Sequence, residues 1–237
     1  MILQNIFSSL INYILPYRCI ACSQITEDNL GICTKCFKDL NFISAPYCIK
    51  CGFPFEFTIQ DQSTCGKCIV KPSSIDIARS LFKFDFKSKK LIHGFKYNDR
   101  TASAGIFAKI ILARYKKDFE DIDIVVPVPM HRIKRIFRQY NPAQILAREI
   151  SERLERKMMP EILIKSKLTK SQTKLTKIQR GKNLSGSIIF NRSRNIAGKN
   201  ILLVDDVKTT GTTSNTCADI LKKHGAAQVK LITIGAT

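Results

Sequence analysis

From Ala78 onward, two kinds of apolar pattern alternate along the chain. Short runs of large apolar and β-branched residues predict strands at Leu81–Phe86, Ile122–Val126, Ile162–Ile164, Ile201–Val204 and Val229–Ile234. Apolar residues at helical spacing predict helices at Lys89–Tyr97, Thr101–Lys116 (with Ile106, Ile110 and Ala113 on one face), Pro142–Arg156 and Ser214–His224, the last ended by Gly225. Strands that alternate with helices predict an α/β fold with a parallel sheet flanked by helices, which binds ligands at the carboxyl ends of its strands.

Before Ala78 the pattern is different. Residues 1–16 have apolar positions at helical spacing up to Pro16, which predicts an amphipathic helix. Its polar face has no basic residue, which favours packing against the protein over a membrane anchor. We expect three parts: this helix, a cysteine-rich module at 17–77 and a basic domain at 78–237. No apolar run reaches the roughly 18 residues of a membrane-spanning helix, so none is expected.

Eight of the nine cysteines form four C-x-x-C pairs: Cys19/Cys22, Cys33/Cys36, Cys48/Cys51 and Cys65/Cys68. A C-x-x-C turn lets both sulfurs face one ion, and two such turns complete a tetrahedral site, so we predict two structural zinc ions in a zinc-ribbon module. Sharing between sequential pairs needs the shortest loop closures and is favoured over interleaving. The spacing differs from that of ferredoxin clusters. The lack of a signal-peptide pattern predicts a cytoplasmic, reducing location, which argues against disulfides.

The net charge of +20, from 39 basic and 19 acidic residues, is unevenly distributed. Residues 1–77 hold six of each sign, and residues 131–200 hold 18 basic against 4 acidic. Such an excess indicates nucleic acid, a membrane surface or a phosphate-rich ligand as partner. Because the cysteine module is neutral, a structural or protein-docking role is favoured for it over a grip on DNA.

The most informative stretch is ILLVDDVKTTGTT at 201–213. An apolar strand leads to Asp205 and Asp206, and a hydroxyl-rich turn then opens a helix. Backbone N–H groups at a helix start and threonine hydroxyls suit a phosphate monoester, while two carboxylates suit vicinal hydroxyls. A phosphate group close to two neighbouring hydroxyls is the arrangement found in ribose 5-phosphate. Neither a Walker A loop nor a Rossmann glycine pattern is present.

Several segments resemble known families. VDDVKTTGTT resembles the phosphoribosyl-pyrophosphate (PRPP) motif of type I phosphoribosyltransferases. VPVPMHRIKRIFRQYNPAQILARE resembles the pyrophosphate-loop segment of the ComF competence-associated family, and LIHGFKYNDR its short upstream motif. TKSQTKLTKIQRGKNLSGSIIF is similar to its hood segment through Thr169, Gln172, Leu175, Arg180, Asn183 and Phe190. With four C-x-x-C pairs in front, the resemblance implies a type I phosphoribosyltransferase-like sheet preceded by a double zinc finger.

The resemblance also implies roles for individual residues. Asp205 and Asp206 would be the catalytic acids that hold the ribose hydroxyls, directly or through Mg²⁺. The 5-phosphate would bind Thr209, Thr210, Gly211, Thr212 and Thr213, and the pyrophosphate would face Arg132, Arg135 and Arg138. Gln139 stands where the family has a glycine, so a positive φ there would strain the loop. Purine-salvage enzymes carry an acid at the position of Thr209, so a purine acceptor is not supported and the acceptor stays open.

The function implied is Mg²⁺–PRPP binding in DNA uptake during natural transformation, with single-stranded DNA and competence-machinery proteins as further partners. The alternative is a non-catalytic adaptor that keeps the fold and binds single-stranded nucleic acid. His131 is expected either to contact phosphate or to lie exposed. Cys217 and His224 are expected to be structural, the first as a small buried residue and the second at a helix end.

Overall fold

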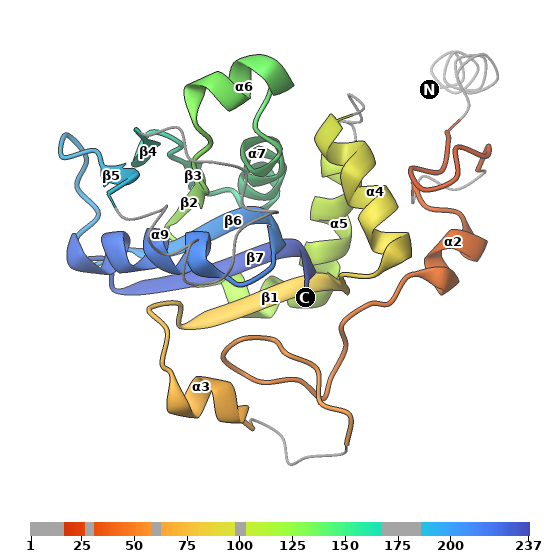
Figure 1. Ribbon diagram of the computed structural model, residues 1–237, viewed down its shortest axis with the longest axis horizontal. Helices are drawn as coiled ribbons and strands as arrows, with labels where there is room; N and C mark the ends of the chain where they lie inside the picture. The colour runs from red at the N-terminus through yellow and green to blue at the C-terminus, as the bar shows by residue number, and fades with distance from the viewer. Residues whose placement is uncertain (1–16, 27–30, 58–62, 98–102, 167–185) are drawn as a thin grey trace, which may run out of the picture.

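The computed structural model describes residues 17–26, 31–57, 63–97, 103–166 and 186–237 (Figure 1). In chain order the elements are α2 (Thr34–Asp39), α3 (Gly66–Val70), β1 (Ile77–Lys83), α4 (Phe86–Tyr97), α5 (Ser103–Tyr115), η1 (Lys116–Phe119), β2 (Ile124–Pro127), α6 (Arg132–Arg138), α7 (Pro142–Leu154), β3 (Lys157–Met158), β4 (Leu163–Lys165), β5 (Ile188–Phe190), β6 (Asn200–Lys208), α9 (Thr212–Lys223) and β7 (Gln228–Ala236). The helix predicted for 1–16 and most of the predicted hood lie outside the described residues. Among the described helices, none has the length and apolar character that a membrane crossing requires.

Five parallel strands form the central sheet in the order β1-β7-β6-β2-β3. The two longest strands, β6 and β7, lie at its centre, where Val204 pairs with Ile232 on one side and with Pro127 on the other. Because all five strands run the same way, their carboxyl ends meet at one edge. The predicted α/β fold with a parallel sheet and flanking helices is confirmed.

Alternate residues of β6 belong to two separate cores, one on each face of the sheet. Leu202 and Val204 pack with buried residues of α4, α5 and α7. Ile201 and Leu203 pack with α9 and the antiparallel strand pair β4–β5. Both faces of the strand are therefore buried, which explains its continuous apolar run.

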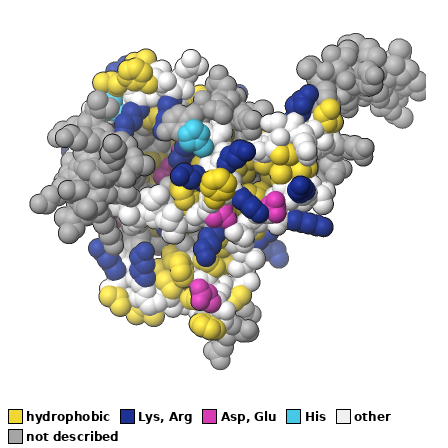
Figure 2. Space-filling model, turned by 45° about the vertical axis from the view of Figure 1, so that its right-hand side comes forward, with side chains coloured by type: hydrophobic (Ala, Val, Ile, Leu, Met, Phe, Trp, Pro, Cys, Tyr) yellow, Lys and Arg dark blue, Asp and Glu magenta, His cyan; other side chains and the backbone are white. Residues whose placement is uncertain are grey.

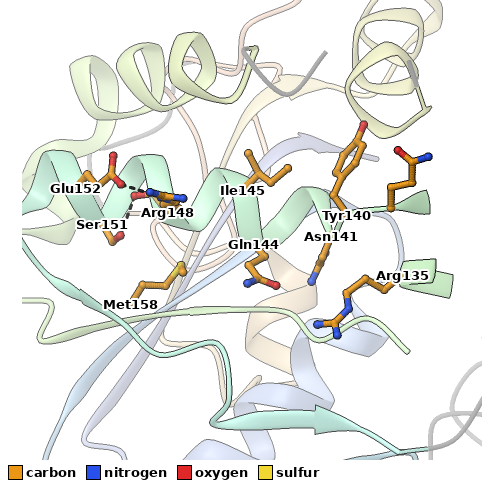
Figure 3. A pocket seen from close by; sticks show the side chains of 10 residues that line it. Arg135, Tyr140, Asn141, Gln144, Ile145, Arg148, Ser151, Glu152 and Met158 are labelled. Atoms are coloured by element: carbon orange, nitrogen blue, oxygen red, sulfur yellow. Dashed lines mark hydrogen bonds and ion pairs between the residues drawn. The ribbon is translucent and has the colours of Figure 1, made fainter. Parts of the chain in front are cut away.

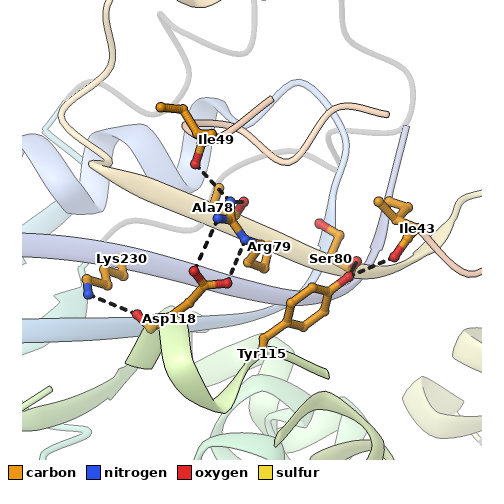
Figure 4. A network of polar contacts seen from close by, with 8 residues as sticks. All are labelled: Ile43, Ile49, Ala78, Arg79, Ser80, Tyr115, Asp118 and Lys230. Carbon is orange, nitrogen blue, oxygen red and sulfur yellow. Dashed lines mark hydrogen bonds and ion pairs between the residues drawn. The ribbon is translucent and has the colours of Figure 1, made fainter. Parts of the chain in front are cut away.

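The free edge of β1 is covered by residues 41–50 of the cysteine module. Ile43 N–H donates to Leu81 O at 3.0 Å, and Ala78 N–H donates to Lys50 O at 2.6 Å. The Tyr115 hydroxyl lies 2.9 Å from Ile43 O and joins this segment to α5 (Figure 4). An exposed sheet edge invites pairing with other chains, so this cover protects it. The contacts support the structural role expected for the module; its boundary at residue 77 stays a prediction.

The strand predicted for Leu81–Phe86 ends three residues early, because Asp85 begins a helix. Ser88 N–H donates to Asp85 Oδ1, and Asp85 N–H donates to Ser88 Oγ, both at 2.8 Å. This reciprocal cap starts α4 at Phe86. The prediction that Phe84 and Phe86 continue the strand is therefore wrong.

The face proposed for helix 101–116 is also only partly right. Phe107, Ala108 and Ile111 face the core, whereas Ala113 is exposed. Ile106 is partly buried because it packs on Gly31 of the cysteine module, where a Cβ would lie only 2.1 Å from Ile106 Cδ1. Two sides of α5 are thus covered, one by the sheet core and one by the module.

Candidate functional site

Asp205 and Asp206 lie inside the central strand, near its carboxyl end. The prediction that this strand stops at Val204 is wrong, because β7 extends beside it and pairs Asp205 with Thr233 and Lys208 with Ala236. Strand alternation sends the two carboxylates to opposite faces of the sheet. On the α9 side, the Ser214 hydroxyl lies 3.5 Å from Asp205 Oδ2. On the α4 side, Lys96 Nζ lies 3.1 Å from Asp206 Oδ1.

The environment of Asp205 favours its protonated form. Burial, and then the negative charge of Asp206, raise the pKa of Asp205 to about 7. The Asp206 N–H, which donates to Asp205 Oδ1 at 2.9 Å, and the nearby Lys96 and Ser214 act in the opposite direction. Carboxylate oxygens are the donors that Mg²⁺ prefers, and each of these two acids offers them on its own face of the sheet. A bound cation would displace the proton that Asp205 holds near neutral pH.

The threonine-rich turn after the acids opens α9. Gly211 precedes the helix with φ of 71°, a conformation that suits glycine. The helix begins at Thr212, two residues before the predicted Ser214, so Thr212 and Thr213 belong to its first turn. Thr210 Oγ1 and Thr212 Oγ1 lie 2.8 Å apart. The first turn of a helix presents backbone N–H groups and a positive dipole end, and with these hydroxyls the turn fits a phosphate group.

The predicted pyrophosphate loop follows the neighbouring strand. Val128 N–H donates to Val204 O at 2.8 Å, which places the end of β2 beside the acid pair. Arg132, Arg135 and Arg138 all lie on the short helix α6, which projects above β2 (Figure 1). His131 is partly exposed and caps this helix, its Nδ1 accepting the Ile133 N–H at 3.2 Å. The His131 imidazole thus caps α6 by a hydrogen bond within its own loop.

The loop after α6 keeps a left-handed residue without a glycine. Gln139 has φ of 65° and ends α6. Asn141 then donates from Nδ2 to Val128 O and accepts the Ala143 N–H, each at 3.2 Å. The Asn141 contacts fix the start of α7 against the end of β2. The strain expected at Gln139 is therefore present, at a cost of about 1 kcal/mol, and the surrounding hydrogen bonds hold the loop in place.

A pocket of about 560 Å³ lies between α6, α7 and β3 (Figure 3). Its walls are Arg135, Gln139, Tyr140, Asn141, Gln144, Ile145, Arg148, Ser151, Glu152 and Met158. Arg148 and Glu152 pair with each other at 2.9 Å, and the Arg135 guanidinium lies on the same side of α7 as Asn141 and Gln144. Arg135 is the one predicted site residue in this wall. The pocket thus adjoins the predicted pyrophosphate loop, and the acid pair lies elsewhere.

Two lysines outside the predicted set interact with the acids, Lys96 with Asp206 and Lys165 with Asp205, and Lys134 interacts with Lys165. Lys96 comes from the LIHGFKYNDR segment, whose resemblance was the available signal. Burial, and then the charge of Lys134, lower the pKa of Lys165, which also senses the charge of Asp205. Burial and then Arg138 lower the pKa of Lys134. Clustered cations of this kind give a positive potential that attracts anionic ligands.

The eight cysteines form two groups of four, Cys19/Cys22/Cys33/Cys36 and Cys48/Cys51/Cys65/Cys68, with the sulfurs of each group within 4.8 Å of one another. The Cys22–Cys33 and Cys51–Cys65 sulfurs are 3.8 and 3.6 Å apart, close to the ~3.8 Å edge of a tetrahedron with Zn–S bonds of about 2.3 Å. Sequential sharing of the C-x-x-C pairs is confirmed, and both groups fit zinc.

Backbone geometry prepares one thiol in each group for ionisation. Burial opposes the charge on Cys19 and Cys48, but backbone N–H donors outweigh it and lower the pKa of each to about 7. The Cys33 and Cys65 N–H groups donate to these two sulfurs at 3.3 Å. Cys217, outside both groups, lies on the core-facing side of α9 and is fully buried, and burial raises the pKa of its thiol. The prediction of an inert buried residue at this position agrees with this environment.

Two family models match the chain. A double zinc ribbon domain matches residues 10–69, and a phosphoribosyl transferase domain matches residues 140–236. The first contains both cysteine groups, and the second contains the acid pair and the threonine turn.

Relatives with assigned names match nearly the whole chain. Competence protein F of Haemophilus influenzae is 28% identical over 222 residues, covering 91% of this chain and 95% of that protein. DNA utilization protein YhgH of Escherichia coli K12 is 26% identical, covering 92% and 96%. Competence protein ComFC of Bacillus subtilis strain 168 is 27% identical, covering 86% and 83%. The chain is therefore a homologue of competence protein F, ComFC and YhgH over about nine-tenths of its length, with a double zinc ribbon followed by a phosphoribosyltransferase domain.

Proposed function

We propose that this chain binds Mg²⁺–PRPP at the carboxyl edge of its sheet and acts in DNA uptake. The observation that carries the proposal is the order of groups at the end of β6: two carboxylates, then left-handed Gly211, then the first turn of α9. The phosphoribosyltransferase match supports the ligand. The names of the relatives, competence protein and DNA utilization protein, support the process.

In this proposal each element has one task. The turn at 209–213 binds the 5-phosphate, and Asp205 and Asp206 orient the ribose hydroxyls, with Lys96 fixing the Asp206 carboxylate. Cleavage at C1 of the ribose leaves negative charge on the departing pyrophosphate. The α6 arginines and the nearby lysines stabilise that charge. When bound, Mg²⁺ would neutralise part of the same charge.

The acceptor is not a purine in this proposal. A purine acceptor needs a base close to its ring, and Thr209 stands where purine-salvage enzymes carry an acid. Release of pyrophosphate, measured over a panel of acceptors that includes DNA, separates turnover from binding.

Thermal unfolding with PRPP and MgCl₂ tests the binding. A ligand at 100 times its Kd stabilises a protein by about 2.7 kcal/mol, so the melting temperature of the wild type should rise with PRPP concentration. Asp206→Asn should remove most of that rise. Asp123→Asn is the matched control, because Asp123 lies just before β2, at the opposite edge of the sheet, and should keep the full response. A wild type whose melting temperature ignores millimolar PRPP would contradict the proposal.

The alternative, a single-stranded nucleic-acid adaptor, is favoured by one observation on α6. This helix exposes Ile136 and Phe137 at 74% and 85% between its arginines. Figure 2 shows Lys and Arg side chains interspersed with exposed apolar ones over one face of the molecule. Aromatic rings between cations suit unstacked bases, worth about 1–3 kcal/mol per stacked base.

The salt dependence of oligo-dT binding distinguishes the adaptor from a protein whose basic residues bind only PRPP. An adaptor binds oligo-dT with an affinity that falls steeply between 50 and 200 mM salt, by roughly 300-fold for six phosphate contacts. Phe137→Ala should weaken that binding and leave PRPP binding unchanged. Weak binding with a flat salt response would exclude the adaptor.

A further inference from the structure

Lys208 joins the second cysteine group to the predicted phosphate turn. It is the last residue of β6 and directly precedes Thr209. Its Nζ donates to Cys51 O at 3.0 Å, inside the second metal-binding turn. Its stem passes Gly211, where an added Cβ would lie 3.7 Å from Lys208 Cε. One side chain therefore donates a hydrogen bond to a cysteine of the second metal group and runs beside the left-handed residue of the phosphate turn.

A second connection reaches the same turn from its helical side. Ser73, five residues after Cys68, donates from Oγ to Asn215 Oδ1 at 2.7 Å. Asn215 lies in the first turn of α9, and its N–H donates to Gly211 O at 2.8 Å. The segment that leaves the second cysteine group is thus tied to the helix start that would hold the phosphate.

The second cysteine turn is also held firmly against the sheet. Arg79 Nη1 donates to Ile49 O at 2.9 Å, and the Arg79 guanidinium pairs with Asp118 (Figure 4). Gly52 has φ of 70°, and a Cβ there would lie 2.6 Å from Ala78 O, so the backbones touch. These contacts give the Cys51 carbonyl a defined position relative to β6.

The first cysteine group offers a natural control, because its contacts go elsewhere. Its turn packs through Gly31 on Ile106 of α5, and buried Cys19 belongs to the core formed with α4, α5 and α7. The two groups have the same ligands and differ in what they touch.

Metal occupancy changes the charge that Lys208 faces. Four thiolates with one Zn²⁺ carry a net charge of −2, which an adjacent ammonium group stabilises. Without metal the four sulfurs lose the bonds that hold them together, and the Cys51 carbonyl loses one of the restraints on its position. Lys208 would then lose its acceptor and shift beside Gly211.

We propose that the second zinc site and the phosphate turn are energetically coupled, with Lys208 as the positioning residue between them. Zinc at this site then favours the ligand-binding form of the turn at 209–213, and a bound phosphate group raises the affinity of the site for zinc by the same factor. The part that concerns ligand affinity rests on the proposed function; the coupling of the zinc site to the turn does not.

The test compares full-length variants by zinc release to a chromogenic chelator and by hydrogen exchange of residues 209–216. Lys208→Met keeps the aliphatic stem and all eight cysteines while removing the donor. It should retain two zinc ions per chain, release one of them about 5- to 20-fold faster, and speed exchange at 209–216 by a similar factor. Cys68→Ser should speed that exchange also, whereas Cys36→Ser should affect α5 and spare 209–216. Lys222→Met is the matched surface control, because its partners are Asp76 and Ala227 O, outside the turn.

Ligand affinity is measured separately, with ribose 5-phosphate as the probe in titration calorimetry. Lys208→Met and Cys68→Ser should weaken its binding by about 5- to 20-fold, and Cys36→Ser by less than twofold. If wild type itself fails to bind ribose 5-phosphate, the proposed function is wrong, while zinc release and exchange still decide the coupling. Equal exchange at 209–216 in Cys68→Ser and Cys36→Ser, or zinc release unchanged in Lys208→Met, would overturn it.

Discussion

Replacing Asp205 by asparagine should stabilise the ligand-free protein and abolish its response to PRPP. Asp205 sits in a place that disfavours its charge, because burial and the neighbouring Asp206 raise its pKa to about 7. Asparagine has nearly the same shape and still offers an oxygen to the Asp206 N–H. The substitution therefore removes the unfavourable charge and keeps the local hydrogen bond.

The size of the effect follows from the pKa. A carboxyl group whose pKa rises from 3.8 to about 7 on folding costs about 4 kcal/mol once it is fully ionised. Because the Asp205 side chain is only partly buried, solvent screens part of this, and we expect about 1–3 kcal/mol. For a domain of this size, that gain raises the melting temperature by about 3–10 °C.

The sign depends on pH. Below about pH 4 both the folded and the unfolded chain keep the proton, so the variant gains nothing from losing the charge. As pH rises from about 4 to 7 the unfolded chain releases its proton first, and the wild type loses stability. Above about pH 7 the full penalty is present. The advantage of Asp205→Asn should therefore grow between pH 5 and pH 8.

Thermal and urea unfolding of both proteins at pH 5 and pH 8, without ligand, measure the difference. Asp39→Asn is the control, because Asp39 forms a half-exposed surface pair with Lys87 whose contribution is small at either pH. With PRPP and MgCl₂ present the order should reverse, since the variant has lost a ligand for the cation or the ribose. A variant less stable than wild type at pH 8, or equally stabilised at both pH values, would refute the reasoning.

Two further substitutions test the framework around the site. Arg79→Met should lower the free energy of unfolding by about 2–4 kcal/mol in urea titrations, because Asp118 loses its ion-pair partner and Ile49 O loses its hydrogen-bond donor. A loss of under about 0.5 kcal/mol would show that the pair contributes little. Gln139→Val should lower the free energy of unfolding by about 1–2 kcal/mol, because a β-branched residue disfavours the positive φ at this position. Gln139→Gly should not lower it. Equal effects of the two substitutions would show that backbone conformation is not the cause.

The sequence predicted features that depend on local spacing. The C-x-x-C pairs gave the two metal groups with their correct partners, because loop closure favours neighbours. The apolar run at 201–204 gave a buried central strand. Its extension to Lys208 was missed, because that length depends on pairing with β7, which begins 20 residues after β6 ends. The Asp85 cap was missed because the aromatic alternation around it favours a strand.

Contacts between distant side chains had no local signal. Lys96 and Asp206 are 110 positions apart, and only the folded sheet brings α4 over the end of β6. Lys208 is a charged residue directly before the threonine turn, yet its partner, the Cys51 carbonyl, is a backbone atom that no sequence pattern marks. Contacts of this kind can be identified only from the three-dimensional structure.

The described cations have different neighbours at the two edges of the sheet. Where the positive charge is unbalanced therefore says more about its role than the total net charge does. Near the start of β7, Lys230 is buried and pairs with Asp121. Arg79 pairs with Asp118, whose backbone carbonyl also accepts from Lys230 (Figure 4). At the carboxyl edge, burial and then the charge of Lys134 lower the pKa of Lys165, and burial and then the charge of Arg138 lower the pKa of Lys134, so neighbouring cations repel one another there. An anion placed there would relieve that repulsion in addition to making its own contacts. The carboxyl edge is therefore least stable when empty, which is the electrostatic condition for tight binding of a ligand with several phosphates.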